Sequence, residues 1–551
     1  IPSIILRLRR VSTFKSRTAA IGPTEPALTI VVSSMIPSSA MDRQRGTSGT
    51  AAMAPPDGPA GIYAATMRTG NQSMRTPTLS RRGFLGCAAG AAFARAAAPP
   101  LNFVFILADD LGWADVGCNG ADLHETPNID RLARMGVRFT SAYAAAPVCS
   151  PTRASILTGK YPARLHMTTW LENSSTPARD RKLIPPVTVG NLPHEEVTLA
   201  EALKERNYLT ALAGKWHLGD AGYYPETQGF DINIGGTHWG APQSYFYPYR
   251  GSRLYGGEFR YVPHLEFGTP GEYLTDRLTD EALRVIEYAG ARPFLLYLAH
   301  HAVHTPIEAK PADEARFKAR LKPALHHSNP AYAAMTWSLD ASVGRVMQKL
   351  AERGIEDRTV IVFFSDNGGA LRASGQEVIT DNSPLRSGKG ALYEGGVRVP
   401  LIIYWPGVTP RGAVSHAPVV SMDLYATLLD MAGLAGSESR QRGVDSVSLT
   451  SLLRDPSSRL DREDLYFHYP HYYPTTTPVS AVRSGPWKLI EFLEDNRVEL
   501  YNLEKDIGER DDLAGRMPQK AAELRRRLHA WRASVSAQMP QPNPRYTAGP
   551  Q

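Results

Sequence analysis

Four apolar runs of strand length recur in the first two thirds of the sequence, and each ends in polar side chains. They are LNFVFILA (101–108), LTALAG (209–214), PFLLYLA (293–299) and TVIVFFS (359–365). Continuous apolar runs of this length are typical of strands buried on both faces of a parallel sheet. Segments between them, such as 126–139 and 332–354, space apolar residues three or four apart, as core-facing helices do. The pattern predicts an α/β fold with a mostly parallel sheet flanked by helices.

The longer helical segment carries a stripe that we expect to face the core, formed by Met335, Leu339, Val343, Val346 and Leu350. After about residue 455 the pattern changes. AVRSGPWKLIEF (481–492) and RVELYNLEKD (497–506) predict antiparallel strands, and MPQKAAELRRRLHAWRASV (517–535) predicts an amphipathic helix. We therefore expect a main domain over residues 99–455 and a smaller C-terminal α+β subdomain over residues 456–551.

The formal net charge of +7 arises in the N-terminal segment. Residues 1–98 hold 12 Lys and Arg residues against three acidic ones, so this segment carries +9. The remaining 49 basic and 51 acidic residues leave residues 99–551 at −2. Without a basic stripe in the body of the chain, nucleic acid is not an expected partner. No apolar run is long enough for a helix to cross a bilayer, so we expect no stable membrane span.

The basic segment contains the pattern of an export signal. MRTPTLSRRGFLGCAAGAAFARAAAPP has paired arginines, a short apolar stretch and an Ala-x-Ala type end, and it resembles a twin-arginine signal peptide. We expect residues 74–98 to be that signal, the export machinery to be a transient partner, and the protein to be periplasmic or secreted from a bacterium. Residues 1–73, rich in Ser, Ala, Pro and Thr, are expected to be an upstream or disordered extension, with Met74 as the true start.

Residues competent for catalysis or metal binding follow each of the four apolar runs. The first run is followed by Asp109 and Asp110 and the last by Asp366 and Asn367, while the middle two lead into Lys215 and His217 and into His300, His301 and His304. Carboxyl ends of parallel strands meet at one edge of a sheet, so these side chains are expected to form one site. Adjacent carboxylates repel each other unless a cation lies between them. Oxygen donors of this kind suit Ca²⁺ or Mg²⁺.

Outside the leader the chain has two cysteines, Cys118 and Cys149. A disulfide between them is the ordinary expectation for an exported protein. The surroundings of Cys149 indicate something else, because it opens the stretch CSPTRASILTGKYPAR (149–164) at the start of a predicted helix. Pro151 suits the first turn of a helix, and a reactive group there would lie where backbone N–H groups favour an anion.

This stretch closely resembles the signature of the type I sulfatases, members of the alkaline phosphatase superfamily in which the cysteine is oxidised to formylglycine. Further motifs of that family occur in the expected order between about residues 101 and 515. They are the Asp109–Asp110 pair, TPNIDRLA (126–133), GKWHLG (214–219), VHTP (303–306), SDNGG (365–369), GKGALYEGGVRVP (388–400), DLYATLLDMAGL (423–434) and LYNLEKDIGERDDLA (500–514). The resemblance implies an alkaline-phosphatase-like fold and hydrolysis of sulfate monoesters.

The resemblance also implies roles for individual residues. A formylglycine-generating enzyme would convert Cys149 to an aldehyde, whose hydrate supplies the nucleophilic hydroxyl. Asp109, Asp110, Asp366 and Asn367 would hold a divalent cation, with Ca²⁺ the first choice and Mg²⁺ the alternative. Arg153 would hold the formylglycine hydroxyls, and Lys215 with Lys389 would neutralise the sulfate oxygens. His304 would protonate the leaving oxygen, and His217 would take a proton from the hydrate. His300 and His301 are candidates only for supporting or substrate contacts.

Two alternatives remain at the level of sequence. One is a formylglycine-dependent phosphodiesterase or phosphonate monoester hydrolase, and the other is a non-catalytic sulfoglycan-binding protein that keeps Cys149 as a thiol. For the substrate, segments 235–251 and 466–474 are dense in Trp, Tyr and His. These aromatic residues either stack on sugar rings or pack between loops. We expect a sulfated saccharide in preference to a small aryl sulfate.

Overall fold

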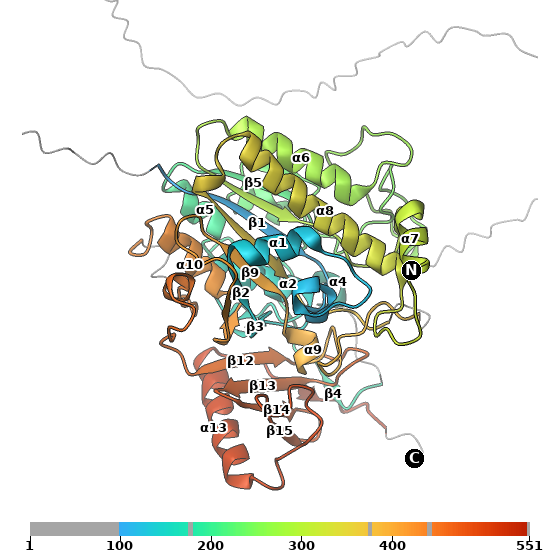
Figure 1. The fold of residues 1–551 in the computed structure, drawn as a ribbon. Coiled ribbons are helices and arrows are strands. Elements are labelled where there is room, and N and C mark those ends of the chain that lie inside the picture. Colours follow the sequence, from blue (N-terminus) through green and yellow to red (C-terminus); the bar gives the residue numbers. More distant parts are fainter. Residues whose placement is uncertain (1–98, 175–179, 373–376, 438–442, 548–551) are drawn as a thin grey trace, which may run out of the picture. The chain divides into compact units, whose positions relative to one another are not determined.

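The computed structural model of the protein describes residues 99–174, 180–372, 377–437 and 443–547 (Figure 1). The extension and the export signal expected over residues 1–73 and 74–98 lie outside the described residues. Within the described part, no helix has the length and apolar character that a membrane span requires. The described residues belong to one compact unit. The expected boundary between residues 455 and 456 stays a prediction.

An eight-stranded sheet forms the centre of the protein, in the order β10-β2-β9-β8-β1-β7-β5-β6. Its strands are β1 (Asn102–Ala108), β2 (Val137–Phe139), β5 (Leu209–Gly214), β6 (Ile232–Ile234), β7 (Phe294–Ala299), β8 (Thr359–Ser365), β9 (Leu401–Tyr404) and β10 (Ala413–Ser415). The strands β8, β1, β7, β5 and β6 run parallel, whereas β9 is antiparallel to both of its neighbours. The expectation of a mostly parallel sheet is confirmed.

The register of the sheet brings four strand ends to the same level. Ala108 at the end of β1 lies opposite Ser365 at the end of β8, and Ala299 at the end of β7 lies opposite Gly214 at the end of β5. The next residue of each chain segment therefore emerges at one edge of the sheet. This is the edge at which the sequence places its catalytic and metal-binding candidates.

Helices cover both faces of this sheet, and β1 shows why. Its Val104 and Ile106 belong to the apolar core that includes residues of α1 (Pro127–Met135), α6 (Leu274–Ala289) and α8 (Pro330–Glu352). Its Phe105 and Leu107 belong to the opposite core, with residues of α2 (Cys149–Thr158), α5 (Leu199–Lys204) and α10 (Asp423–Met431). Side chains alternate between the two faces of a strand, so both faces need covering. The predicted stripe of α8 is buried in the first core.

One sequence-based element needs correction. The sequence predicts a single helical stretch over residues 126–139, but α1 ends at Met135 and residues 137–139 form β2, which lies next to the edge strand β10. At Gly136 a Cβ atom would lie only 2.3 Å from the carbonyl oxygen of Ile403 in β9. The helix ends where the two backbones come this close, and the chain continues as a strand beside β9. The contact joins residues far apart in the sequence, so a local pattern does not reveal it.

The C-terminal part forms a separate antiparallel sheet, as expected. Its strands follow one another as β12 (Asp464–Tyr469), β13 (Val479–Ser484), β14 (Trp487–Phe492) and β15 (Val498–Asn502). The terminal helix α13 (Pro518–Ser534) lies beside this sheet (Figure 1). Its Leu524 and Leu528 belong to the same apolar core as Leu489 of β14. The remaining strands and α-helices of the described residues are β3 (Ala142–Tyr143), β4 (Leu183–Ile184), β11 (Val419–Val420), β16 (Gln541–Pro542), α3 (Pro162–Leu165), α4 (Leu171–Ser174), α7 (Pro311–Lys318), α9 (Glu394–Val397) and α12 (Thr450–Arg454).

Candidate active site

A cavity of about 740 Å³ opens at this edge of the main sheet. Five of the predicted site residues line it, namely Asp110, Cys149, His217, His304 and Lys389. The other five are fully buried and belong to the same network of hydrogen bonds and ion pairs: Asp109, Arg153, Lys215, Asp366 and Asn367. The structure therefore brings all ten predicted residues into one site, although they come from six different segments of the chain.

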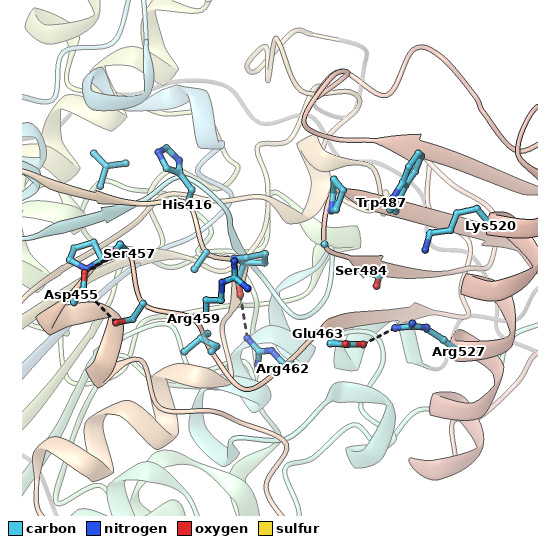
Figure 2. Close-up of a pocket in the computed structure, with 18 residues that line it drawn as sticks. His416, Asp455, Ser457, Arg459, Arg462, Glu463, Ser484, Trp487, Lys520 and Arg527 are labelled. Atoms are coloured by element: carbon cyan, nitrogen blue, oxygen red, sulfur yellow. Dashed lines mark hydrogen bonds and ion pairs between the residues drawn. The ribbon is translucent and has the colours of Figure 1, made fainter.

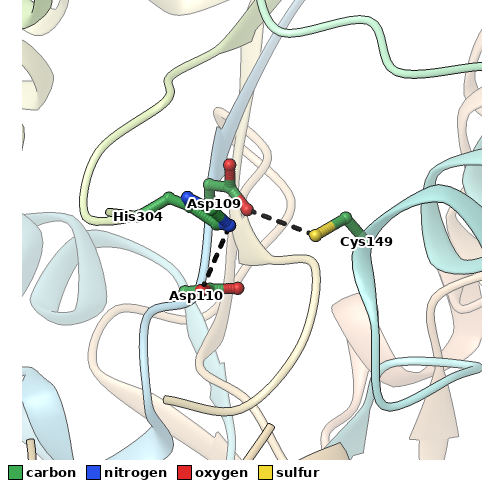
Figure 3. A group of neighbouring side chains, drawn as sticks. All are labelled: Asp109, Asp110, Cys149 and His304. Carbon is green, nitrogen blue, oxygen red and sulfur yellow. Dashed lines mark hydrogen bonds and ion pairs between the residues drawn. The ribbon is translucent and has the colours of Figure 1, made fainter. Parts of the chain in front are cut away.

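Cys149 is the first residue of α2, and its thiol faces the carboxylates at the end of β1 (Figure 3). The Sγ atom lies 3.7 Å from Oδ1 of Asp109. Burial raises the pKa of Cys149 to about 12, so the thiol is protonated at neutral pH. Cysteines that act as nucleophiles need a lowered pKa, and this environment does the opposite. Cys118 and Cys149 are both free thiols, so the disulfide that an exported protein would ordinarily form does not join them.

Each of the three buried carboxylates has its own cationic partner. Lys215 Nζ donates to Asp109 at 2.7 Å, Lys389 Nζ lies 2.7 Å from Asp110, and Arg153 Nη2 lies 2.8 Å from Asp366. Burial acts to raise the pKa of Asp110, but the neighbouring Lys389, His304 and Lys215 outweigh it and hold that pKa well below its usual range. For Asp366, burial and the nearby Asp109 prevail and raise the pKa.

The oxygen-rich donor set fits a divalent cation. Ligand atoms of Asp109, Asp110, Cys149 and His304 all lie within 4.8 Å of one another. Asp366 Oδ1 accepts a hydrogen bond from the Asp110 N–H at 3.2 Å, which places this third carboxylate against the pair. The Oδ1 atom of Asn367 is buried and has no hydrogen-bond partner among the described residues. Carboxylates and an amide oxygen with spare capacity are what Ca²⁺ and Mg²⁺ sites use.

Two histidines line the cavity in different surroundings. His304 Nε2 lies 3.6 Å from Asp110 Oδ2, and burial lowers the pKa of His304 to about 3. His217 Nε2 lies 3.0 Å from Glu172 Oε2, and burial lowers the pKa of His217 to about 4. Both imidazoles are therefore neutral at pH 7 when no substrate is bound. A bound anion would raise the pKa of either ring.

The other two histidines after β7 have structural contacts. His300 Nε2 lies 2.9 Å from Ser342 Oγ in α8, and the His301 carbonyl accepts the Tyr245 hydroxyl at 2.6 Å. Among the described residues that line the cavity, neither histidine occurs. The supporting role considered for them is compatible with these positions, and contact with a substrate stays a prediction.

The aromatic segments contribute less to the cavity than their composition suggests. Within the described lining, segment 466–474 supplies Tyr473, and segment 235–251 supplies Gly240 and Ala241 without an aromatic ring. Most of their other aromatic residues lie in the apolar cores or pack against them. Trp170, Glu172, Tyr255 and Arg260 also line the cavity. No motif or strand-end pattern marked these four, because loop contacts of this kind depend on the folded arrangement.

A second, larger cavity lies elsewhere and has different chemistry (Figure 2). It measures about 1010 Å³ and is lined mainly by residues 414–418, 455–463 and 484–487 together with two residues of α13. Its Arg462 pairs with Asp423 at 2.6 Å and its Arg527 pairs with Glu463 at 2.9 Å. The lining contains none of the ten predicted site residues. Size alone would favour this cavity, but the smaller one holds the buried acids, lysines and histidines that catalysis requires.

An α/β sheet that has a buried cysteine, an oxygen-donor cluster and two buried lysines at its carboxyl edge is the arrangement expected of a hydrolase of anionic esters. Comparison with protein families makes this more specific. A model of the family described as sulfatase matches residues 101–434, and one described as N-sulphoglucosamine sulphohydrolase, C-terminal, matches residues 388–535. The chain belongs to the sulfatase family and acts as a sulfatase.

Individual relatives agree with this assignment. A protein named sulfatase from Formosa agariphila is 32% identical over 500 residues, covering 78% of this chain and 88% of that protein. Human N-acetylgalactosamine-6-sulfatase is 32% identical over 458 residues, covering 76% of this chain and 83% of its own. Among solved structures, Ps i-CgsB in complex with k-i-k-neocarrahexaose has a TM-score of 0.66 and 31% identity, covering 80% of this chain and 94% of that one.

Proposed function

We propose that this sulfatase hydrolyses O-sulfate esters of saccharides with a formylglycine derived from Cys149 and one bound divalent cation. The observation that carries the proposal is the position of the Cys149 side chain, 3.7 Å from Asp109 within a cluster that also contains Asp110 and His304. A protonated, buried thiol is unsuited to nucleophilic attack. The same position, converted to an aldehyde hydrate, would present a hydroxyl beside the metal-binding carboxylates.

The proposed cation site consists of Asp109, Asp110, Asp366 and Asn367, with Ca²⁺ as the first candidate and Mg²⁺ as the alternative. When bound, the cation would supply Lewis-acid chemistry and a template for the sulfate group. Lys215 and Lys389, whose ammonium groups already contact Asp109 and Asp110, would neutralise sulfate oxygens as well. Their charges are buried, which strengthens such an interaction relative to one in water.

Proton transfer would fall to the two histidines that line the cavity. His304 would donate a proton to the leaving oxygen, because the negative charge of a bound ester raises its pKa from the low value of the free site. His217 would accept a proton from the hydroxyl derived from Cys149. Arg153, whose Nε donates to Asp366 at 2.8 Å, would orient the group at position 149 from one turn further along α2.

A saccharide substrate is supported by two relatives. One is named for sulfated N-acetylgalactosamine and the other is solved with a neocarrahexaose. The cavity supplies Trp170, Tyr255 and Tyr473, whose rings can stack on sugars, next to the charged residues that would hold the sulfate. A solved phosphonate monoester hydrolase shares the fold at 20% identity, with a TM-score of 0.58. At this level of identity the similarity concerns the fold and not the activity.

The test begins with position 149. Protein made with a formylglycine-generating enzyme is digested, and the tryptic peptide FTSAYAAAPVCSPTR is analysed by mass spectrometry for the aldehyde. The modified enzyme is then assayed with matched aryl sulfate and aryl phosphate esters and with a panel of defined sulfated saccharides, using Cys149→Ala as the control. Release of sulfate from saccharides by the modified protein alone supports the proposal. Preference for the phosphate ester, or full activity with an unmodified thiol, would overturn it.

We also propose export through the twin-arginine route, on the basis of Arg81 and Arg82 ahead of the apolar stretch. This route carries folded proteins, so Cys149 could be oxidised in the cytoplasm before translocation. Residues 74–98 fused to a reporter should direct it to the periplasm. Replacement of Arg81 and Arg82 by lysines should retain the reporter in the cytoplasm, and continued export of that variant would contradict the assignment.

A further inference from the structure

Glu172 lies in the wall of the active-site cavity and contacts His217 directly. The two come from different parts of the chain, since Glu172 belongs to the short helix α4 and His217 follows β5. Glu172 Oε2 lies 3.0 Å from His217 Nε2. The other carboxylate oxygen, Oε1, accepts the N–H of Gly240 at 3.3 Å and lies 3.7 Å from Arg260 Nη2. Both oxygens of Glu172 are therefore engaged, and the orientation of its carboxylate is fixed.

His217 is held from several sides as well. Its N–H donates to the Thr237 carbonyl at 2.9 Å, and its own carbonyl accepts the hydroxyl of Ser150, the neighbour of Cys149, at 2.7 Å. Gly240 packs so closely on the imidazole that a Cβ there would lie 2.4 Å from Cε1. The remaining ring nitrogen, Nδ1, is buried and has no hydrogen-bond partner within the described part of the chain.

We infer that Glu172 is a positioning residue that keeps the imidazole proton of His217 on Nε2 and leaves the lone pair on Nδ1. The inference rests on the proposed function, in which His217 accepts a proton from the hydroxyl derived from Cys149. A carboxylate accepts hydrogen bonds, so the nitrogen that faces Glu172 has to carry the proton in the neutral ring. The unpartnered Nδ1 is then the basic atom. Carboxylates that orient a working histidine through its other nitrogen are a recurrent arrangement in enzymes.

The charges around His217 are consistent with a neutral base. Burial is the main effect that lowers its pKa, and Lys215 and Arg153 lower it further, whereas Glu172 raises it. When Nδ1 takes up a proton, the imidazolium is stabilised by the adjacent carboxylate of Glu172. Loss of that carboxylate would weaken the base and would also remove the constraint on which nitrogen holds the proton.

The substitution Glu172→Gln tests the inference sharply. Gly240 N–H and Arg260 are both donors, so the amide oxygen of the glutamine is expected to remain with them. Its NH₂ group then faces His217 Nε2, which forces the lone pair onto Nε2 and the proton onto Nδ1. With the wrong nitrogen protonated, kcat for 4-nitrophenyl sulfate should fall by about 100-fold or more, while KM changes less than about threefold.

Glu258→Gln is the matched control. Glu258 Oε2 lies 2.7 Å from Arg260 Nη2, so this substitution weakens the other ion pair of the same arginine without touching His217. Its kcat should stay within about twofold of the unsubstituted enzyme. Rates for all proteins are divided by the fraction of formylglycine at position 149, measured by mass spectrometry, so that differences in modification do not count as differences in catalysis.

A second readout does not depend on activity. In protein labelled with ¹⁵N-histidine and left unmodified at Cys149, long-range ¹H–¹⁵N spectra report which imidazole nitrogen carries the proton, and a His217→Gln variant identifies the signal. We expect the Nε2–H form in the unsubstituted protein and its loss in Glu172→Gln. An unchanged tautomer or a normal kcat in Glu172→Gln would overturn the inference. Equal losses of kcat in Glu172→Gln and Glu258→Gln would also overturn it. A modified enzyme that releases no sulfate would instead refute the proposed function, while the spectra would still test the role of Glu172.

Discussion

A buried charge cluster ties the loop of Lys389 to the C-terminal sheet, and removing its lysine gives a clear stability prediction. Lys488 in β14 is fully buried and lies 2.7 Å from Glu394 Oε1 and 2.9 Å from Glu509 Oε1. Glu394 opens α9, five residues after Lys389. The substitution Lys488→Met keeps the length of the side chain but leaves two carboxylates buried with less positive charge beside them.

The expected loss can be worked out from this geometry. Removing one partner of a buried ion pair costs about 3–5 kcal/mol, because the remaining charge stays desolvated. Unfolding entropy is about 2.1 cal/mol/K per residue, which gives about 1 kcal/mol per degree for a folded region of about 450 residues. The midpoint of thermal unfolding should therefore fall by about 3–5 °C. Burial and Glu394 raise the pKa of Glu509 to about 7, so Glu509 is protonated below that pH and the loss should be smaller at pH 6 than at pH 8.

Differential scanning fluorimetry at both pH values measures this shift. Lys505→Met, at an exposed position, is the control and should change the midpoint by less than about 1 °C. The double substitution Lys488→Met with Glu509→Gln removes one of the stranded charges and should recover at least half of the loss. A midpoint for Lys488→Met equal to that of the control, or a double variant less stable than Lys488→Met, would refute the reasoning.

Three further predictions concern catalysis and pH. Removal of divalent cations with EDTA should abolish sulfate release, and Ca²⁺ or Mg²⁺ should restore it; full activity after exhaustive chelation would contradict the proposed donor set. Lys389→Ala should lower kcat for an aryl sulfate by about 100-fold, since it removes a buried charge from the proposed sulfate site. Steady-state kinetics measure this change, and an unchanged kcat would contradict the proposed role of Lys389. Burial lowers the pKa of His300 to about 3, so its contribution to stability is present above pH 6.5 and is lost as the pH falls toward 3. The midpoint of thermal unfolding should accordingly drop between pH 7 and pH 5. If the midpoint of His300→Gln falls as steeply with pH as that of the unsubstituted protein, His300 is not the cause of the drop.

Much of the fold could be predicted because buried parallel strands leave a strong local pattern. The runs that became β1, β5, β7 and β8 are predominantly apolar, and the polar residues after them occupy one edge of the sheet. The end of α1 was less predictable, because the approach of Gly136 to Ile403 joins residues far apart in the sequence. The strand β12 was not expected, since segment 466–474 was interpreted only as aromatic residues that either stack on sugar rings or pack between loops.

The candidate site divides in the same way. Strand-end residues such as Asp109 and Asp366 could be inferred from position, whereas Cys149 and Lys389 became candidates through their motifs. Their catalytic roles stay predictions, although the structure places them together. Glu172 gave no signal of either kind. It contacts His217 only because α4 lies beside the loop after β5, and the position of such a loop is set by the whole fold and not by nearby residues.

The burial of α2 has a consequence for the timing of biosynthesis. All ten residues from Cys149 to Thr158 are buried, and the Lys389 carbonyl that borders the cavity accepts a hydrogen bond from Thr475 at 2.7 Å. An enzyme that reads residues 149–153 as its substrate cannot reach them once these parts have closed. Thr475 leaves the ribosome about 330 residues after Cys149, which at about 5–20 residues per second takes about 16–65 s. If Cys149 is converted as proposed, the conversion competes with folding in that interval, and faster synthesis or faster folding would lower the fraction of modified chains.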